Sequence, residues 1–363
     1  YFPSASAFSP FPGGVVTQKN VGRTYNEATS IGVYTQLEFH LNNQIDLITG
    51  GRITRDEKSG SFTFGNPGNL ETISFDYKKT KPSYLVGVNY KPTEDVLTYA
   101  KFSTAYVSGG SVAGIPFEPE TVKSWELGVK AELFDGMLQT NLAVYTATYK
   151  NFQVASSGTN YRDQITEITG NSALAGAIGS FVVDQGGPVD AEGVELDIVA
   201  APMAGVTLGS SLGYSKTTYE DVSPVLLSAN AGTYLPVMRP EWTGALWAQY
   251  DSAPIGDSNA YMTFRADSTW TSDVNLAFNP NLPAYDQGNF ANSVAEIPSY
   301  WVVNARMALR DLDIGGAKAE IALWSKNLTD SDEKGYGVNL SQIFAQANYI
   351  PARTYGLDLT VEF

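Results

Sequence analysis

Residues 354–363 read TYGLDLTVEF and end the sequence on an aromatic residue. Apolar side chains alternate here without a break with polar or small ones, at Tyr355, Leu357, Leu359, Val361 and Phe363. A period of two places the apolar residues on one face of a β-strand and the others on the opposite face. Two structures fit this segment. One is a membrane strand with its apolar face on lipid and its last aromatic ring at the interface, and the other is the final strand of a soluble antiparallel sheet.

The same alternation recurs along the chain. It is clear in residues 121–134, 194–200 and 300–310. The first of these runs is followed by Asp135-Gly136, a dipeptide typical of tight hairpins, and the alternation then continues in residues 137–152. Strands of about ten residues are the length that a tilted membrane strand requires.

The connections between these strands are alternately short and long. Short turns are expected at residues 41–44, 91–95, 134–136, 201–205, 252–258 and 311–316. Long loops rich in Gly, Ser and Asn are expected at residues 58–81, 108–120, 155–188, 218–239, 272–298 and 330–351, and residues 171–179 (NSALAGAIG) are the one candidate for a helix. A soluble sandwich has no reason to place every long loop at one end, whereas outer-membrane barrels have short turns on one side and long loops on the other.

Composition agrees with a membrane barrel. Charged residues are 17% of the chain and the mean hydropathy is -0.15. No apolar run reaches the ~18 residues of a membrane-spanning helix. Alternation keeps the average hydropathy low even where half of every strand faces lipid. The net charge of -15 argues against a nucleic-acid partner.

These patterns predict an all-β fold, a transmembrane antiparallel up-and-down β-barrel of the outer-membrane type, over residues 1–363. Counting from residues 15–23 gives about fourteen strands. Aromatic residues near strand ends suggest interface girdles, although aromatics favour strands in general. They include Tyr99, Tyr145, Trp242, Trp247, Tyr250 and Trp324.

Several motifs resemble those of TonB-dependent outer-membrane receptors. Near the C-terminus they are NLTD at residues 327–330 and, after a loop, PARTYG at residues 351–356. Nearly the whole chain shares the likeness, including residues 30–60, 97–110, 117–154 and 191–202. The resemblance implies a receptor in the outer membrane of a Gram-negative bacterium. Such a receptor binds a scarce nutrient, which would be an iron chelate, a cobalamin-like compound or an oligosaccharide, and imports it with energy from a TonB complex.

The sequence departs from this family pattern in one respect. Family members have barrels of about twenty-two strands with a plugged lumen, and their plug follows a short TonB-contacting box. Neither plug nor box is recognisable here. We therefore expect the chain to be the C-terminal part of such a barrel, with the plug outside the sequence. Were the 363 residues complete, the lumen would be unplugged, so a passive diffusion channel is the alternative function, and a soluble β-sandwich lectin or adhesin is a third.

No catalytic or metal-binding constellation is recognisable. His40 is the only histidine, and we interpret it as a turn or interface residue. The acidic run at residues 330–333 lacks the spacing of a calcium loop. We therefore expect no enzymatic activity, no cofactor and no resident metal ion. The expected partners are the nutrient ligand, the TonB complex through the plug, and outer-membrane lipid and lipopolysaccharide.

Charged residues on the polar faces of the strands are the first group of candidate site residues. Facing the lumen keeps them out of lipid, where an Arg or Lys costs about 2–4 kcal/mol at mid-membrane. We expect them to line the solute path or to contact a plug, unless they only hydrate the wall. They are Glu126, Lys130, Glu132, Glu195, Asp197, Arg306, Arg310, Asp358 and Glu362.

Aromatic and amide residues of the long loops are the second group, because binding residues concentrate in loops carried by a rigid scaffold. The candidates for ligand capture are Tyr161, Tyr285, Asn289 and Phe290.

Overall fold

The computed structural model describes most of the chain. The described residues are 21–66, 68–112, 114–156, 162–170, 182–229, 232–277, 279, 296–340 and 344–362. The terminal aromatic Phe363 and the candidate helix at residues 171–179 lie outside them.

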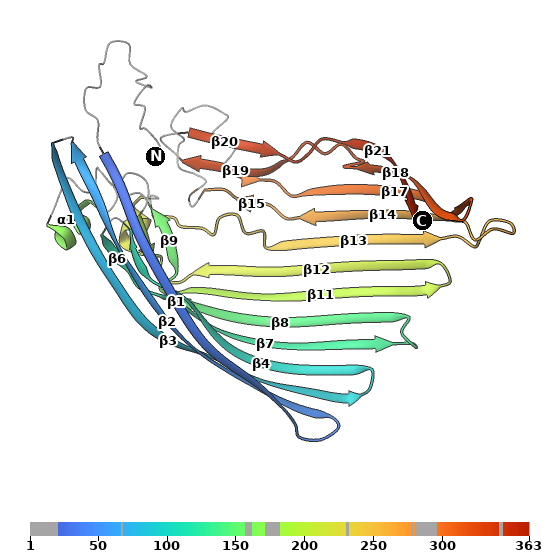
Figure 1. The fold of residues 1–363 in the computed structure, drawn as a ribbon, viewed down its shortest axis with the longest axis horizontal. Coiled ribbons are helices and arrows are strands. Elements are labelled where there is room, and N and C mark those ends of the chain that lie inside the picture. Colours follow the sequence, from blue (N-terminus) through green and yellow to red (C-terminus); the bar gives the residue numbers. More distant parts are fainter. Residues whose placement is uncertain are drawn as a thin grey trace, which may run out of the picture.

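One large antiparallel sheet of 13 strands forms the body of the molecule, as Figure 1 shows. Its strands lie side by side in sequence order, each pairing with the next. This order confirms the predicted up-and-down, all-β fold. The strands are β1 (Val21–His40), β2 (Ile45–Asn66), β3 (Asn69–Thr93), β4 (Val96–Val107), β7 (Glu120–Leu133), β8 (Leu138–Lys150), β11 (Val189–Met203), β12 (Val206–Tyr219), β13 (Trp242–Asp251), β14 (Tyr261–Thr271), β17 (Tyr300–Ile314), β18 (Ala317–Lys326) and β21 (Thr354–Glu362).

The described sheet has one strand fewer than the sequence suggested. The strand expected at residues 15–23 is not separate, because its described residues, Val21 to Arg23, begin β1. The loop expected at residues 58–81 is also wrong. There β2 and β3 stay paired as far as Asn66 and Asn69. This extension carries alternating large side chains, of which Phe62 and Phe64 are buried, so a strand accounts for it better than a loop.

Small elements occupy the ends of the long connections. They are the hairpins β5 (Gly110–Val112) with β6 (Ile115–Phe117), β9 (Gln153–Ser156) with β10 (Val182–Gln185), β15 (Val274–Asn275) with β16 (Glu296–Ile297) and β19 (Lys334–Leu340) with β20 (Phe344–Tyr349), and the helices α1 (Arg162–Thr169) and α3 (Pro224–Ala229). They gather at one end of the sheet, opposite the short turns. In the described part of the chain, neither helix has the length and apolarity needed to cross a membrane.

The short turns were placed correctly. Between β7 and β8, Phe134, Asp135 and Gly136 have φ angles of 57°, 54° and 81°, all in the left-handed region. Gly adopts that region freely and Asp tolerates it, so the Asp-Gly pair suits this sharp reversal. The turn is closed by the Met137 amide, which donates to the Phe134 carbonyl at 3.1 Å.

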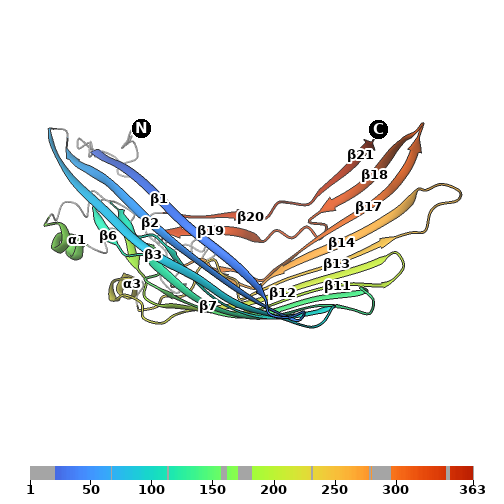
Figure 2. The same ribbon diagram turned by 60° about the horizontal axis from the view of Figure 1, so that its bottom comes forward.

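In a soluble protein the apolar face of a sheet is buried and the polar face is exposed. In this sheet the apolar face is the more exposed one. In β7, Trp125 and Leu127 expose 59% and 55% of their surface, whereas Glu126 between them and Gly128 after them are half-buried. Figure 2 shows that the sheet is bent into a trough. Side chains converge on a concave face and splay on a convex one. We therefore assign the polar face to the inside of the trough and the apolar face to the outside.

The C-terminal strand follows the same rule. Leu357 and Leu359 of β21 are 68% and 66% exposed, and Val129 of β7 is 36% exposed. These apolar side chains do not lie beneath a second layer. Such exposure is unfavourable in water and favourable in hydrocarbon.

Adjacent residues on β8 provide a test of the two faces. Leu142 lies on the apolar face, level with Val129 and Leu196, and Asn141 lies on the polar face, level with Lys130 and Asp197. Leu142→Arg should destabilise the protein in lipid vesicles by about 2–4 kcal/mol because the charge enters hydrocarbon. Asn141→Arg should change the free energy of unfolding by no more than about 0.5 kcal/mol. The free energy of unfolding in denaturant titrations measures both, and equal losses would contradict the assignment of faces.

Candidate functional site

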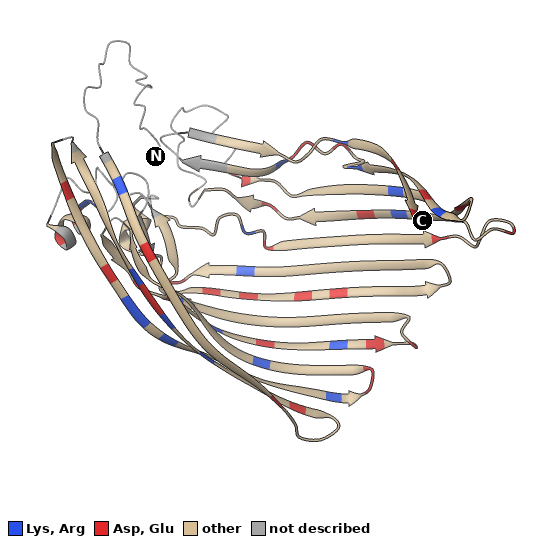
Figure 3. Cartoon of the chain, viewed as in Figure 1, with Lys and Arg blue, Asp and Glu red and all other residues tan. Residues whose placement is uncertain are grey.

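The polar face of the sheet holds all the charged candidates from the sequence. Strand register places them in two groups, one on β7 and β11 and the other on β17 and β21. The first group is Glu126, Lys130, Glu132, Glu195 and Asp197, and the second is Arg306, Arg310, Asp358 and Glu362. Figure 3 shows that charged residues occur on almost every strand of the sheet.

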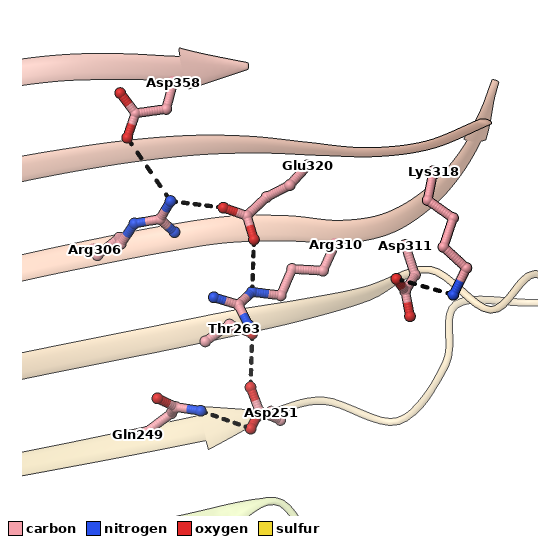
Figure 4. Close-up of polar contacts among 9 residues, drawn as sticks. All are labelled: Gln249, Asp251, Thr263, Arg306, Arg310, Asp311, Lys318, Glu320 and Asp358. Atoms are coloured by element: carbon pink, nitrogen blue, oxygen red, sulfur yellow. Dashed lines mark hydrogen bonds and ion pairs between the residues drawn. The ribbon is translucent and has the colours of Figure 1, made fainter. Parts of the chain in front are cut away.

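An ion-pair network joins three members of the second group, Arg306, Arg310 and Asp358, across β17, β18 and β21 (Figure 4). Arg306 Nη2 lies 2.6 Å from Glu320 Oε1, and Arg310 Nε lies 2.9 Å from Glu320 Oε2. Arg306 Nη2 also lies 3.8 Å from Asp358 Oδ2. One carboxylate thus joins two guanidinium groups, and a second carboxylate extends the network to β21. Glu362 lies further along β21, level with Lys318.

A second network surrounds Glu126 on β7. Lys101 Nζ lies 2.9 Å from Glu126 Oε2, and the Tyr99 hydroxyl donates to Glu126 Oε1 at 2.9 Å. Neither Lys130 nor Glu195 forms an ion pair with any residue that the structure describes. The wall therefore combines charges that are neutralised locally with charges left open to solvent.

The other two members of the first group make hydrogen bonds. Asp197 accepts a hydrogen bond from Ser211 Oγ at 2.6 Å. Glu132 accepts one from Gln139 Nε2 at 3.3 Å. Both bonds run between neighbouring strands, so these carboxylates connect the wall laterally.

Aromatic rings lie over glycines on this polar face. A Cβ atom at Gly209 would lie 2.1 Å from the Trp247 ring, and one at Gly356 would lie 2.1 Å from Trp324. Tyr99 covers Gly128, and Tyr145 covers Gly193, with corresponding distances of 2.4 and 2.5 Å. Such pairing fills the space that a strand glycine leaves open. The girdle expected from the sequence was therefore wrong for Tyr99, Tyr145, Trp247 and Trp324.

The polar atoms of these rings extend the networks of the wall. Trp324 Nε1 donates to Asp358 Oδ1 at 3.1 Å, and the Tyr145 hydroxyl donates to Ser215 Oγ at 3.1 Å. The Arg265 guanidinium lies 4.6 Å from the centre of the Trp247 ring. Glu320 and Arg265 were not among the residues predicted from the sequence, although both belong to strands in which polar residues alternate with apolar ones.

The long-loop end of the polar face is packed by the small elements. Ile165 of α1 is 1% exposed and packs in one cluster with Phe62, Phe64 and Ile115. Next to this cluster, the Gly109 amide donates to the Tyr77 hydroxyl at 3.0 Å, and burial raises the pKa of Tyr77. Tyr77 therefore stays neutral at physiological pH.

Basic and aromatic side chains gather on the polar face of β2 and β3 at this end. Lys58 Nζ donates to the Gly109 carbonyl at 2.7 Å and lies 5.7 Å from the Tyr77 ring centre. Lys79 lies level with Asp56 and Lys81 with Thr54, so both share the face that carries Lys58. This basic surface carries three Lys residues beside the carboxylate of Asp56, in a chain whose net charge is -15. The sequence signal for it is the run YKKTK at residues 77–81.

The loop candidates Tyr161, Tyr285, Asn289 and Phe290 lie outside the described residues. Their part in ligand capture stays a prediction.

His40 ends β1 beside a short turn, as expected. Its Nδ1 lies 2.6 Å from Asp46 Oδ1, and Lys91 Nζ lies 3.3 Å from Asp46 Oδ2. Ligand atoms of Glu38, His40 and Asp46 all lie within 4.8 Å of one another. Because the buried Asp46 is already paired with His40 and Lys91, we interpret the group of Glu38, His40 and Asp46 as an ion-paired turn.

The contact between Gly209 and Trp247 predicts a specific cost. Gly209→Ala should destabilise the protein by about 1–3 kcal/mol because the ring must move. Gly244→Ala is the matched control, since its Cβ would have no neighbour closer than 3.6 Å. Unfolding titrations in vesicles measure both variants. If Gly209→Ala costs as much in a Trp247→Ala background, the ring is not the cause.

The chain is similar in sequence to known proteins. Residues 1–328 match the family described as TonB dependent receptor-like, beta-barrel. The ferrichrome outer membrane transporter/phage receptor of Escherichia coli K12 is 24% identical over 85% of this chain and 35% of its own length. The ferric-pyoverdine 358 receptor of Pseudomonas putida is 26% identical over 60% of this chain and 24% of its own length.

Solved structures share the fold. The ferric yersiniabactin uptake receptor FyuA of Yersinia pestis has a TM-score of 0.72 at 16% identity, covering 95% of this chain and 47% of that one. The closed form of the ferric-catecholate import receptor Fiu of E. coli K12 has a TM-score of 0.68 at 16% identity, covering 93% of this chain and 45% of that one.

The chain spans only about a third or less of the curated relatives' length, with 35% and 24% covered in the two named above. These relatives are named as receptors and transporters. With an apolar outer face, a charged inner face and a family match over most of its length, the chain belongs to the TonB-dependent receptor family of Gram-negative outer-membrane β-barrels.

Proposed function

We propose that residues 1–363 form the C-terminal part of the barrel wall of a TonB-dependent importer for an iron chelate. The observation that carries this proposal is the polar face, where side chains are held by networks between strands and a basic, aromatic surface lies at the long-loop end. Relatives named for ferrichrome and ferric pyoverdine support an iron chelate as cargo. Neither of these two relatives is named for a cobalamin-like compound or an oligosaccharide.

Capture would take place at the long-loop end, which faces outward in outer-membrane barrels. Lys79 and Lys81 would attract acidic groups of the chelate, and the Tyr34 ring, with the Arg52 guanidinium 6.0 Å from its centre, would contact its apolar parts. Lys79 is paired with Glu118 at a separation of 3.6 Å. Both side chains are exposed, so the pair is weak and an incoming anion can displace it.

Passage inward would follow the polar face. We propose that the network of Arg306, Arg310, Glu320 and Asp358 faces a plug supplied by the rest of the protein. Energy relayed by TonB would displace that plug, since a ligand captured tightly from dilute solution leaves slowly by itself. A passive diffusion channel, the alternative from the sequence, would need no such energy.

Uptake measurements test the importer and its capture surface together. In a strain lacking the chromosomal receptor, the full-length protein should restore iron-limited growth and uptake of radioactive iron given as ferrichrome or ferric citrate, provided TonB is present. Lys79→Gln with Lys81→Gln should weaken binding of the anionic ferric citrate about tenfold, a loss of about 1.4 kcal/mol.

Arg55→Gln with Lys78→Gln is the matched control. Both residues lie on the opposite face of the same hairpin and pair with Glu57, at 2.6 and 3.0 Å. This control should bind as wild type does. Uptake that persists without TonB would contradict the importer and favour a channel, whereas equal losses in the two double variants would contradict only the capture surface.

A further inference from the structure

The apolar face of the sheet is interrupted by a row of small residues. In strand register, Ala248 of β13 lies level with Ala266 of β14, which lies level with Ala305 of β17, and Ala305 lies level with Ser325 of β18. The neighbouring row toward the short turns is large. It consists of Tyr250, Phe264, Met307 and Leu323.

The difference in side-chain size between these two rows leaves a groove across the outside of the sheet. Its volume is ≈ 710 Å³, within the range of sites that hold small molecules. Leu328 and Tyr355 line it at the long-loop end, and Val206 and Tyr250 line it toward the short turns. The groove therefore runs obliquely down the face that meets hydrocarbon.

Ser325 is the polar exception in this row. It is only 8% exposed, and its Oγ atom is buried without a hydrogen-bond partner. Buried hydroxyl groups are nearly always hydrogen-bonded. An unpaired hydroxyl lining an apolar groove points to an occupant that brings its own hydrogen-bonding oxygen.

The positively charged side chain of Arg353 lies at the long-loop end of the groove. The Arg353 guanidinium lies 5.7 Å from the Tyr355 ring centre, and Arg353 Nη1 donates to the Leu328 carbonyl at 3.3 Å. It also pairs with Asp330 at 3.2 Å, and its side chain remains 37% exposed. Ser325 lies level with Tyr355, and Arg353 precedes Tyr355 by two residues, directly before β21 begins. At about 3.4 Å per residue of extended chain, Arg353 is about 7 Å from Tyr355 along the strand direction.

We propose that this groove seats one acyl chain of an anionic outer-leaflet lipid. The lipid phosphate meets Arg353, an ester carbonyl accepts a hydrogen bond from Ser325, and the chain lies along Ala305, Ala266 and Ala248. The order of groups in a membrane lipid, phosphate, ester and hydrocarbon, matches the order of groups along the groove. A lipid is the chosen occupant because the groove is continuous with the face that an outer-membrane barrel presents to hydrocarbon.

The test uses the full-length protein in vesicles that contain phosphatidylglycerol with a spin label on the acyl chain. Electron paramagnetic resonance measures the fraction of immobilised label. Filling the groove with Ala266→Leu and Ala305→Leu should lower that fraction by about half or more, because added side-chain volume displaces the chain. Ala100→Leu is the matched control, since Ala100 lies on the same face of β4, level with Val88 and Leu127.

Ser325→Ala should speed exchange between immobilised and mobile label by about threefold, since one hydrogen bond is lost. An unchanged exchange rate would overturn the role assigned to Ser325. Equal immobilised fractions in wild type and the filled variant would overturn the acyl-chain seat. The acyl-chain seat would also be overturned if the wild type were a dimer and the filled variant a monomer, because the occupant would then be a second copy of this chain. Heat-modifiable migration in SDS gels verifies that every variant is folded.

Discussion

Pairing of backbone amides and carbonyls between neighbouring strands is the constraint from which the rest of this structure follows. Hydrocarbon offers no partner for an N–H or C=O group, so each membrane strand must be bonded on its flanks by others. In the described sheet, every strand between β1 and β21 meets this demand with antiparallel ladders in sequence order, and β1 and β21 are each paired on one flank. Once the backbone is satisfied in this way, the side chains are free to differ between the two faces.

Two environments then act on alternate residues of every strand. Outward residues are selected for lipid, and the exposed Leu357 and Leu359 are stable there for the reason that would make them costly in water. Inward residues carry charge, and neighbouring strands supply their partners, as Glu320 does for Arg306 and Arg310. Rings lying over glycines fill the space above those residues and pack this wall closely.

The ends of the sheet have different tasks. Short turns between strands are tight and are closed by backbone hydrogen bonds, as at Phe134 to Met137. The long-loop end holds the helices, the hairpins and the basic surface of β2 and β3, where we propose that the iron chelate is captured. The groove on the outer face descends from that same end, so the solute and an outer-leaflet lipid would meet opposite sides of one wall.

The sequence by itself determined the class of fold, the position of the short turns and the face on which the charged candidates of β7, β11, β17 and β21 lie. A period of two assigns faces whatever the neighbouring strand is, which is why Glu126 and Leu127 were separated correctly. Only the tertiary structure decided which residues meet across strands. Trp247 covers Gly209, and Arg306 pairs with Glu320, because of strand register. Alternation leaves every register shift of two residues equally acceptable, so interstrand contacts, like the long pairing of β2 with β3, depend on packing that no single strand encodes.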